Sequence, residues 1–271
     1  MQHSESIAKH RAYMPEGTQR ILNARSLRTA HQRLATLLRP GLMVVDVGCG
    51  TGAMTRDMAA AVAPHGQVVG VDINTALIAE ARRSHGTVPG LSFAVCDVYT
   101  LPFRVAFDLV SAARVLQWLA RPLDALRLLV AATKPGGRVV ILDYNHEKII
   151  WHPSPPASMR LFYTAFLRWR TEAGMDNAVA DHVAEMCARV GLVNIVMTPE
   201  PEVSRRTDPD FAVRLGLWAE VAATRGHQMV TDGVITEFQR AAAETEYSAW
   251  LQENAASQRL YLMAVEGTRP K

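Results

Sequence analysis

Short apolar runs alternate with amphipathic stretches through the first half of the chain. The apolar runs are compact and rich in β-branched residues, as strands buried on both faces of a sheet are. Between the runs, apolar residues recur at the spacing of a helix. The predicted strands cover 42–47, 68–73, 91–95, 107–112 and 137–143, and the predicted helices cover 51–63, 75–84 and 122–133. This alternation predicts an α/β fold with a parallel sheet covered by helices.

The second half of the chain is mainly helical in pattern. Residues 151–156 are rich in proline and predict a stiff loop, after which Met159, Phe162, Phe166 and Trp169 fall on one helical face. The other predicted elements are a helix over 181–190, a strand over 193–197, at least two helices within 208–258, a final strand over 260–265 and, ahead of the sheet, a helix over 19–38.

We expect these elements to form a single domain spanning 1–271, because all the predicted strands fit one sheet. An N-terminal helical segment, 1–40, precedes the sheet, and helical cap elements lie within 146–190 and 205–258. The chain has no apolar run long enough for a membrane span, and its first residues lack the apolar core of a signal peptide. A cytoplasmic protein without membrane contact is therefore expected.

Charge and cysteine content exclude several classes of protein. The chain carries 29 basic and 26 acidic residues spread along its length, and this balance does not favour nucleic-acid binding. Cys49, Cys96 and Cys187 are few and far apart, which predicts neither a disulfide framework nor a zinc cluster. The cysteines agree with a reducing cytoplasm.

A glycine-rich loop, VVDVGCGTG at 44–52, ends the first strand and opens a helix. Glycines let the backbone turn sharply and let a ligand approach closely. Gly48, Gly50 and Ala53 also satisfy the dinucleotide-binding pattern, so the loop sequence alone does not identify the ligand. Asp46 would repel the pyrophosphate of a dinucleotide, whereas it would favour the amino and sulfonium groups of S-adenosylmethionine.

Two more acids follow the next strands. Asp72 ends the second strand, where it is placed to accept hydrogen bonds from ribose hydroxyls, and Asp97 follows the third, where it can accept from an adenine amino group. Because parallel strands end at one edge of a sheet, both acids are expected beside the glycine loop.

Five ordered segments resemble the motifs of class I S-adenosylmethionine-dependent methyltransferases, in particular small-molecule, UbiE-like methyltransferase domains. The segments are DVGCGTG, VVGVDIN, FAVCDVYTLPF, FDLVSAARVLQWL and KPGGRVVILDY, within about 42–145. The resemblance implies a doubly wound, Rossmann-like sheet of seven strands, mostly parallel, whose last strand is antiparallel. It implies contacts with S-adenosylmethionine, or with the product S-adenosylhomocysteine, by Asp46, Gly48, Cys49, Gly50, Gly52, Asp72, Ile73, Asp97, Val98, Ala113 and Arg114. Tyr13 and Met14 resemble residues that fold over the cofactor in some relatives.

Methyl transfer requires mainly that donor and acceptor are held in line at short distance. A general base is needed only if the acceptor atom loses a proton. His146 is the preferred candidate base, with Tyr144 and His152 nearby in sequence, although His146 also fits the description of a loop histidine that only bonds its neighbours.

The cap sequence suggests a small acceptor, because cap helices bury a ligand and exclude water. The face of Met159, Phe162, Phe166 and Trp169 is either an acceptor wall or ordinary packing. Three arginines beside it either bind an anionic acceptor or form a solvated basic face. These are Arg160, Arg168 and Arg170. The oligomeric state stays open, with a homodimer through the cap helices as one alternative.

Narrower enzyme classes lack their motifs in this chain. The segment after the fourth strand, Ala113 to Leu116, has neither the Pro-Pro-aromatic motif of amino-methylating nucleic-acid enzymes nor a pocket cysteine. Asp143 and Asn145 match two ligands of a catechol-type metal site, but the carboxylate after the fourth strand is missing, so no metal is expected.

Two other functions remain as alternatives. Tyr144 and Lys148 have the Tyr-x-x-x-Lys spacing of short-chain NAD-dependent dehydrogenases, although in that family the pair lies on a helix well after the strand. A protein that binds S-adenosylmethionine without transferring its methyl group would carry the same cofactor motifs. Turnover with an acceptor discriminates the second alternative from an enzyme.

Overall fold

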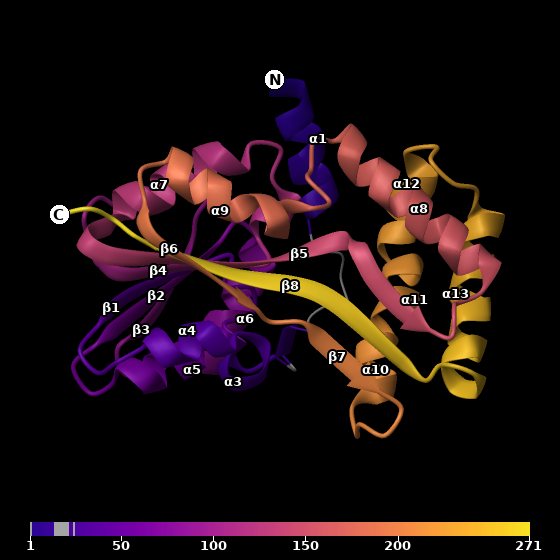
Figure 1. Cartoon of the computed structure of the whole chain (residues 1–271), viewed down its shortest axis with the longest axis horizontal. Helices are drawn as coiled ribbons and strands as arrows, with labels where there is room; N and C mark the ends of the chain where they lie inside the picture. The colour runs from indigo at the N-terminus through magenta and orange to yellow at the C-terminus, as the bar shows by residue number, and fades with distance from the viewer. Residues whose placement is uncertain (1, 14–21, 24) are drawn as a thin grey trace.

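A mixed β-sheet runs through the centre of the computed structural model, which describes residues 2–13, 22–23 and 25–271 (Figure 1). The strands are β1 (Met43–Val47), β2 (Gln67–Asp72), β3 (Leu91–Val95), β4 (Phe107–Ala113), β5 (Thr133–His152), β6 (Val193–Pro199), β7 (Glu202–Arg205) and β8 (Ser257–Thr268). Within the described residues these eight strands form one sheet in the order β3-β2-β1-β4-β5-β8-β6, and β7 pairs with β8 beside that path.

Strands β1 to β5 run parallel to one another, whereas β8 is antiparallel to both β5 and β6. The predicted α/β fold is therefore confirmed, including the antiparallel last strand, although the described residues form eight strands and not the seven that the resemblance implied. The first four predicted strands match β1 to β4 to within one residue at each end. Strand β7 was not predicted, because its sequence EVSR is short and mostly polar and becomes a strand by pairing with β8.

Helices cover both faces of the sheet. The helices are α1 (Gln2–Ala12), α3 (Leu27–Ala30), α4 (Gln32–Leu37), α5 (Ala53–Val62), α6 (Thr75–His85), α7 (Pro122–Ala132), α8 (Ala157–Glu172), α9 (Val179–Arg189), α10 (Phe211–Leu215), α11 (Leu217–Ala223), α12 (Arg225–Thr231) and α13 (Glu237–Glu253), with short 3₁₀ turns η1 (Val98–Thr100) and η2 (Leu116–Trp118). In Figure 1, α7 and α9 lie above the sheet, and α3, α4 and α5 lie below it.

Strand β1 shows why the apolar runs are nearly continuous. Successive side chains of a strand point to opposite faces. Val45 and Val47 pack with residues of α7 and α9, whereas Val44 packs with residues of α4, α5 and α6. Both faces of the strand are thus buried, which favours apolar side chains at most positions; the exception, Asp46, accepts a hydrogen bond from Thr55.

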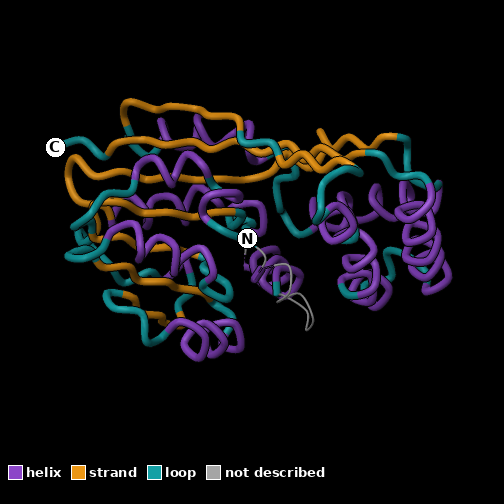
Figure 2. Tube along the Cα trace, turned by 90° about the horizontal axis from the view of Figure 1, so that it is seen from below, coloured by secondary structure: helices purple, strands orange, loops and turns teal. Residues whose placement is uncertain are grey.

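The helices α8 and α10 to α13 form a separate layer at one end of the sheet, which we call the cap (Figure 2). Its core is aromatic and includes Phe162, Trp169, Trp218, Tyr247 and Trp250. Helix α9 packs instead against the sheet, on the face that it shares with α7. The predicted division into a 1–40 segment and cap elements within 146–190 and 205–258 remains a prediction.

Two long strands join the cap to the sheet. β5 continues to His152, where the predicted stiff loop 151–156 should already have begun, so that prediction was wrong for its first two residues. Trp151 pairs with Gln258 and His152 with Ser257, after an irregularity in the pairing between Asn145 and Ile150. The antiparallel partner β8 extends the strand, which the proline content alone did not reveal.

The N-terminal part differs from the predicted continuous helix over 19–38. Residues 19–21 and 24 lie outside the described residues. Residues 22–23 are helical, and from residue 27 the chain forms two short helices, α3 and α4, separated at His31, whose φ of −158° and ψ of 73° are not helical. Helix α1 lies within the predicted helical segment 1–40 but outside the predicted helix 19–38, and it contacts η2 and α8. Among the described residues, no helix is both long and apolar enough to cross a membrane.

The aromatic core of the cap gives a testable prediction. Phe162 is 2% exposed, whereas its neighbour Leu161 on the same helix is 66% exposed. Removing a buried phenylalanine ring costs about 3–5 kcal/mol. We expect Phe162→Ala to lower the thermal midpoint by roughly 10 °C, and Leu161→Ala to change it little, measured by scanning calorimetry. Equal shifts for the two variants would contradict the described packing of α8.

Candidate functional site

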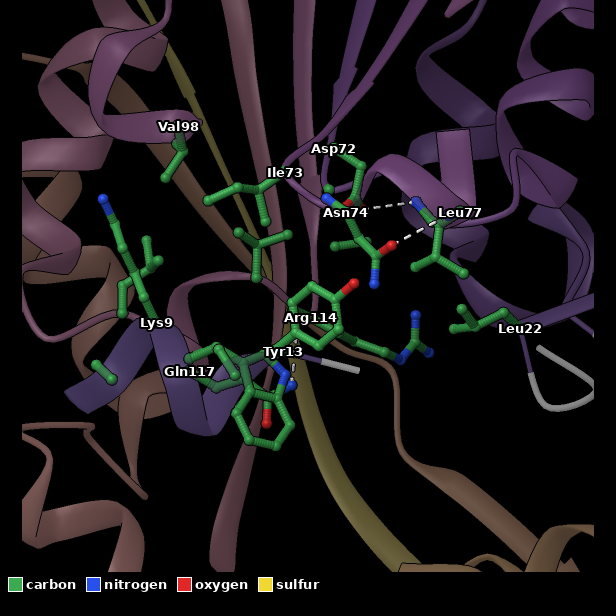
Figure 3. Close-up of a pocket in the computed structure, with 18 of the residues that line it drawn as sticks. Lys9, Tyr13, Leu22, Asp72, Ile73, Asn74, Leu77, Val98, Arg114 and Gln117 are labelled. Atoms are coloured by element: carbon green, nitrogen blue, oxygen red, sulfur yellow. Dashed lines mark hydrogen bonds between the residues drawn. The ribbon is translucent and has the colours of Figure 1, made fainter. Parts of the chain in front are cut away.

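A cavity of about 550 Å³ opens at the carboxyl ends of the central strands, within the size range of ligand sites. Its walls come from α1, the glycine loop, the ends of β2, β4 and β5, and the cap helices α8 and α11. Figure 3 shows Lys9 of α1 on one side and Asp72, Asn74 and Leu77 on the other, with Tyr13 and Arg114 between them. The cavity therefore joins the sheet to the cap.

The glycine loop forms one wall of the cavity through Gly48 and Gly50. Gly48, Gly50 and Gly52 all have positive φ angles, of 76°, 56° and 78°, which L side chains rarely adopt. A Cβ atom on Gly48 would lie 2.3 Å from Cγ2 of Val115. The loop thus requires glycine at this position both for its backbone conformation and for its contact with the segment after β4.

Asp72 lies at the end of β2, and backbone groups fix its carboxylate. Oδ2 accepts from the Gly50 amide at 2.9 Å, and Oδ1 accepts from the Asn74 amide at 2.9 Å. Burial raises the pKa of Asp72, and these two backbone bonds oppose that rise. Asp72 lines the cavity, and its role as an acceptor for ligand hydroxyls stays a prediction.

Ile73, Asp97 and Val98 also line the cavity, as predicted. Ile73 is 50% exposed, a large apolar surface within a binding site. Asp97 Oδ1 accepts from the Tyr99 amide at 2.9 Å, and Asp97 Oδ2 lies 2.7 Å from Nζ of Lys9. Sequence analysis missed Lys9, because a lysine on a polar helix gives no signal of such a contact.

Three predicted cofactor residues, Asp46, Cys49 and Gly52, do not line the cavity. Asp46 was expected to face the ligand, but it is 1% exposed and accepts from Thr55 Oγ1 at 2.7 Å. Burial raises the pKa of Asp46 to about 7. Cys49 packs beneath the loop beside Gly70. Asp46 lies outside the cavity because side chains alternate along β1. It lies on the same face as Val44 and points toward α5. Gly52 likewise packs against Phe93 and lies outside the lining.

Ala113 and Arg114 line the cavity at the end of β4. Arg114 has a φ of 61° and is only 6% exposed. Its Nε donates to Tyr144 Oη at 3.0 Å, and its Nη2 donates to the carbonyl oxygen of Ala30 at 3.0 Å and to the carboxylate of Glu202. Burial lowers the pKa of Arg114, but the nearby Tyr144 and Glu202 more than offset this and raise it. A fixed cation therefore stands in the cavity wall.

His146, the candidate base, also lines the cavity. Its Nε2 lies 2.6 Å from Oε1 of Gln117, and its backbone amide donates to the carbonyl of Asn177 at 2.7 Å. Gln117 in turn donates from its side chain to the carbonyl of Arg114 at 3.2 Å, which assigns Oε1 as the acceptor. Burial and the charge of Arg170 hold the pKa of His146 well below its usual value. The imidazole is therefore neutral at neutral pH.

The Tyr144 and Lys148 pair does not form a dehydrogenase site. Both residues lie on β5 and not on a helix. Tyr144 Oη bonds to Arg114, whereas Lys148 Nζ lies 2.6 Å from Oδ2 of Asp181 on the surface. His152, the other candidate near the fifth strand, pairs with Ser257 away from the cavity. The spacing match is a coincidence of sequence.

Of the predicted aromatic face on α8, only Phe166 lines the cavity, and the rest pack inside the cap. Trp218 of α11 and Trp118 of η2 complete the wall, and sequence analysis missed both because the fold brings them there from distant segments. Arg170 was predicted either to bind an anionic acceptor or to lie on a solvated face, and both predictions were wrong. It is fully buried and donates to Asn177 Oδ1 and to the carbonyl of Gln117, both at 2.8 Å.

Asp143 and Asn145, which match two ligands of a catechol-type metal site in sequence, have other partners in the structure. Asp143 is buried and accepts from the amides of Gln117 and Tyr144, and Asn145 donates to Asp181. Burial raises the pKa of Asp143 to about 7. Over the residues that the structure describes, no group of three or more histidine, cysteine or acidic side chains converges as a metal site would require.

Comparison with known families agrees with this geometry. Residues 45–141 match a family model described as a methyltransferase domain. The ubiquinone/menaquinone biosynthesis C-methyltransferase UbiE of Ectopseudomonas mendocina is 37% identical over 112 residues, which cover 40% of this chain and 44% of that protein. An uncharacterized 37.1 kDa protein in transposon TN4556 of Streptomyces fradiae is 36% identical over 112 residues, which cover 41% of this chain and 32% of that protein. The chain thus spans less than half the length of these curated relatives.

Solved structures share the fold. The phosphoethanolamine N-methyltransferase 2 of Haemonchus contortus, in complex with S-adenosyl-L-methionine, superposes with a TM-score of 0.56 at 19% identity, over 98% of this chain and 56% of that one. The [4+2]-cyclase SpnF superposes with a TM-score of 0.53 at 19% identity, over 98% of this chain and 91% of that one. Both solved structures therefore show the fold of this chain, and residues 45–141 match a methyltransferase domain. Over its matched segment the chain is similar in sequence to the UbiE methyltransferases.

The close contact at Gly48 predicts a loss of cofactor binding on substitution. Gly48→Ala would place a Cβ against Val115, whereas Gly41→Ala meets nothing within 4 Å although its φ is also positive, at 89°. Both variants carry the left-handed strain of about 1–2 kcal/mol. We expect only Gly48→Ala to weaken S-adenosylhomocysteine binding, by about tenfold or more, in isothermal titration. Comparable weakening by Gly41→Ala would show that backbone strain, and not the contact, decides binding.

The buried carboxyl of Asp46 predicts a pH dependence of stability. Its pKa is raised from 3.8 to about 7, so between these values the folded protein keeps a proton that the unfolded chain releases. Wild-type stability therefore falls as pH rises from about 4 to 7. Asp46→Asn has no titrating group at this position, and its side-chain oxygen can still accept from Thr55. The thermal midpoint of the variant relative to that of the wild type should therefore rise as pH increases from about 4 to 7.

Asp108→Asn is the matched control for this pH series. Burial alone would raise the pKa of Asp108, but its bonds to Lys134 and to the Met43 amide lower it below the usual value. The difference between Asp108→Asn and the wild type should stay constant from about pH 5 to 8. A flat difference for Asp46→Asn as well would show that Asp46 is ionised in the folded protein.

Proposed function

We propose that the protein binds S-adenosylmethionine and transfers its methyl group to a small-molecule acceptor, by O-, N- or C-methylation. One observation carries this proposal: the glycine loop and Asp72 line the same cavity as an aromatic chamber under the cap. A donor held by the loop would therefore share an enclosed space with an acceptor held by the cap.

The residues present fit the cofactor. Gly48 and Gly50 leave room that a Cβ atom would fill, Asp72 offers an acceptor for ribose hydroxyls, and Ile73 and Val98 present apolar surface for the adenine ring. Asp97 Oδ2 already contacts Lys9, and its second lone pair is available to the adenine amino group. Tyr13 lines the cavity from the end of α1, while Met14 lies outside the described residues.

S-adenosylmethionine supplies an electrophilic methyl group when it is bound. The contribution of the protein is to hold the acceptor in line with that methyl group and to exclude water. Phe166 and Trp218, whose ring centres are 5.8 Å apart, provide a rigid apolar wall for the acceptor. Positioning of this kind lowers the activation free energy by about 7–11 kcal/mol in the best cases.

His146 is our proposed base for acceptors that lose a proton. Its ring is neutral, and its Nε2–H donates to Gln117, which leaves the lone pair on Nδ1 to accept a proton. The same burial that keeps the ring neutral disfavours the imidazolium. His146 would therefore accept a proton only from an acidic acceptor group.

The partners and location are also part of the proposal. The enclosed cavity favours a small molecule over nucleic acid, and we place the protein in the cytoplasm, with a homodimer as one alternative for its assembly. The relatives described as UbiE C-methyltransferases support carbon as one candidate target atom. A solved structure with this fold is described as a [4+2]-cyclase, which keeps binding without methyl transfer as the second candidate function.

Ligand-dependent thermal stability tests the cofactor. S-adenosylhomocysteine at about a hundred times its dissociation constant should add ~2.7 kcal/mol, or several degrees, whereas NAD should add nothing. Asp72→Ala should abolish the shift. Asp108→Ala is the matched control, since it also removes a carboxylate that accepts a backbone amide, but outside the cavity. A shift with NAD alone would overturn the proposal.

The role of His146 has its own test. For an acceptor with an ionisable proton, His146→Asn should lower kcat by about 10²-fold or more and leave the S-adenosylhomocysteine affinity unchanged. Wild-type kcat should show no inflection near pH 6.5, because the pKa of His146 lies well below that value. Unchanged kcat in the variant would assign His146 to packing against Tyr144 and Gln117.

A further inference from the structure

We propose that the guanidinium of Arg114 binds an anionic oxygen of the methyl acceptor, so that the acceptor is an apolar, ring-bearing acid. This inference rests on the proposed function and names the substrate class of that site. It follows from three features of the cavity wall: an unpaired buried donor, an excess of positive charge and an aromatic surround.

The unpaired donor is Nη1 of Arg114. Its other polar groups are held by Tyr144, Ala30 and Glu202, which fix the plane of the guanidinium. Nη1 itself is buried and has no hydrogen-bond partner among the described residues. A buried donor without a partner is unfavourable, whereas a ligand oxygen at this point would satisfy it.

A buried unpaired donor is not a site by itself, as Arg170 shows. Nη1 of Arg170 is also unpaired among the described residues. However, Arg170 does not line the cavity, and its guanidinium carbon lies 4.5 Å from the ring centre of Trp118. Arg114 differs because it lines the cavity, where a ligand can reach it.

The charges around Arg114 leave an excess of positive charge. Arg25 also lines the cavity, and its pKa is lowered by burial and then by the charge of Arg114, which places the two cations close together. Glu202 is the carboxylate that bonds Arg114. The next acid, Glu200, is held instead by His31 and by the amides of Gln32 and Arg33. An anionic ligand would balance the second cation.

Aromatic rings surround the rest of this part of the cavity. The ring of His146 stacks on Tyr144 at 5.2 Å, and Phe166 stands edge-on to His146 at 6.3 Å. Trp218 closes the wall from the cap. Flat apolar surfaces of this kind suit a ring system, and the guanidinium beside them suits a carboxylate or phenolate attached to that ring.

A carboxylate could also come from the methionine part of the cofactor, and the experiment separates the two sources. Wild-type protein saturated with S-adenosylhomocysteine is titrated with 2-naphthoate and with the neutral 2-naphthamide, following tryptophan fluorescence. The cofactor site is tested separately with S-adenosylhomocysteine and with methylthioadenosine, which lacks the amino-acid carboxylate. The variants are Arg114→Gln, Arg114→Lys and, as a control, Arg33→Gln, which removes an arginine paired with Glu266 outside the cavity.

We expect the wild type to bind naphthoate about tenfold or more tightly than naphthamide. Arg114→Gln should abolish this preference, and any change in its affinity for S-adenosylhomocysteine should be matched by the same change for methylthioadenosine. Arg114→Lys should keep part of the preference because the charge remains, and Arg33→Gln should keep all of it. A preference that survives Arg114→Gln would overturn the inference.

Two other results are equally decisive. If Arg114→Gln weakens S-adenosylhomocysteine but not methylthioadenosine, the anion at Arg114 is the carboxylate of the cofactor, and the acceptor assignment is wrong. If the wild type binds neither adenosine compound, the proposed function fails and the inference fails with it. If the wild type binds S-adenosylhomocysteine but shows no preference for naphthoate, the inference is contradicted and the proposed function is not.

Discussion

The antiparallel pairing of β5 with β8 holds the structure together around its cavity. β5 runs from the parallel sheet toward the cap and β8 runs back from the cap into the sheet, and near the cap Ile150, Trp151 and His152 pair with Arg259, Gln258 and Ser257. The ladder thus connects the parallel sheet, whose strand β1 carries the glycine loop, with the part of the chain that leads into the aromatic helices of the cap. The cavity is the space that remains between them at the carboxyl ends of the strands.

The electrostatics of the cavity divide it into two parts. On the side of the glycine loop, Asp72 and Asp97 offer acceptor oxygens that backbone amides hold in place. On the side of the cap, Arg114 and the neutral His146 stand among aromatic rings. A donor rich in hydroxyl and amino groups suits the first part, and an apolar acceptor with an anionic group suits the second.

The sequence predicted the sheet well because its strands are local signals. The central strands β1 and β4 are buried on both faces, and this leaves a clear pattern of compact apolar runs. Strand β7 and the end of β5 left no such pattern, since they form only through pairing with the distant β8. Interactions between segments far apart in the chain are not encoded in a local window.

The site followed the same rule. Gly48, Gly50, Asp72 and Val98 line the cavity as predicted, because motif order places them at strand ends. Asp46 does not, because the alternation of side chains along β1 turns it toward Thr55. Lys9, Trp118, Trp218 and Arg25 could not be identified, since nothing near them in sequence indicates a binding site.

The central claim is that a methyl group passes from the cofactor to a small molecule inside this cavity. The most direct measurement incubates the protein with methyl-labelled S-adenosylmethionine and a small-molecule fraction of cell extract, and identifies labelled products by mass. The account predicts a labelled small molecule that the wild type forms and Asp72→Ala does not. Cofactor binding without any labelled product across such fractions would contradict methyl transfer and favour a protein that binds S-adenosylmethionine for another purpose.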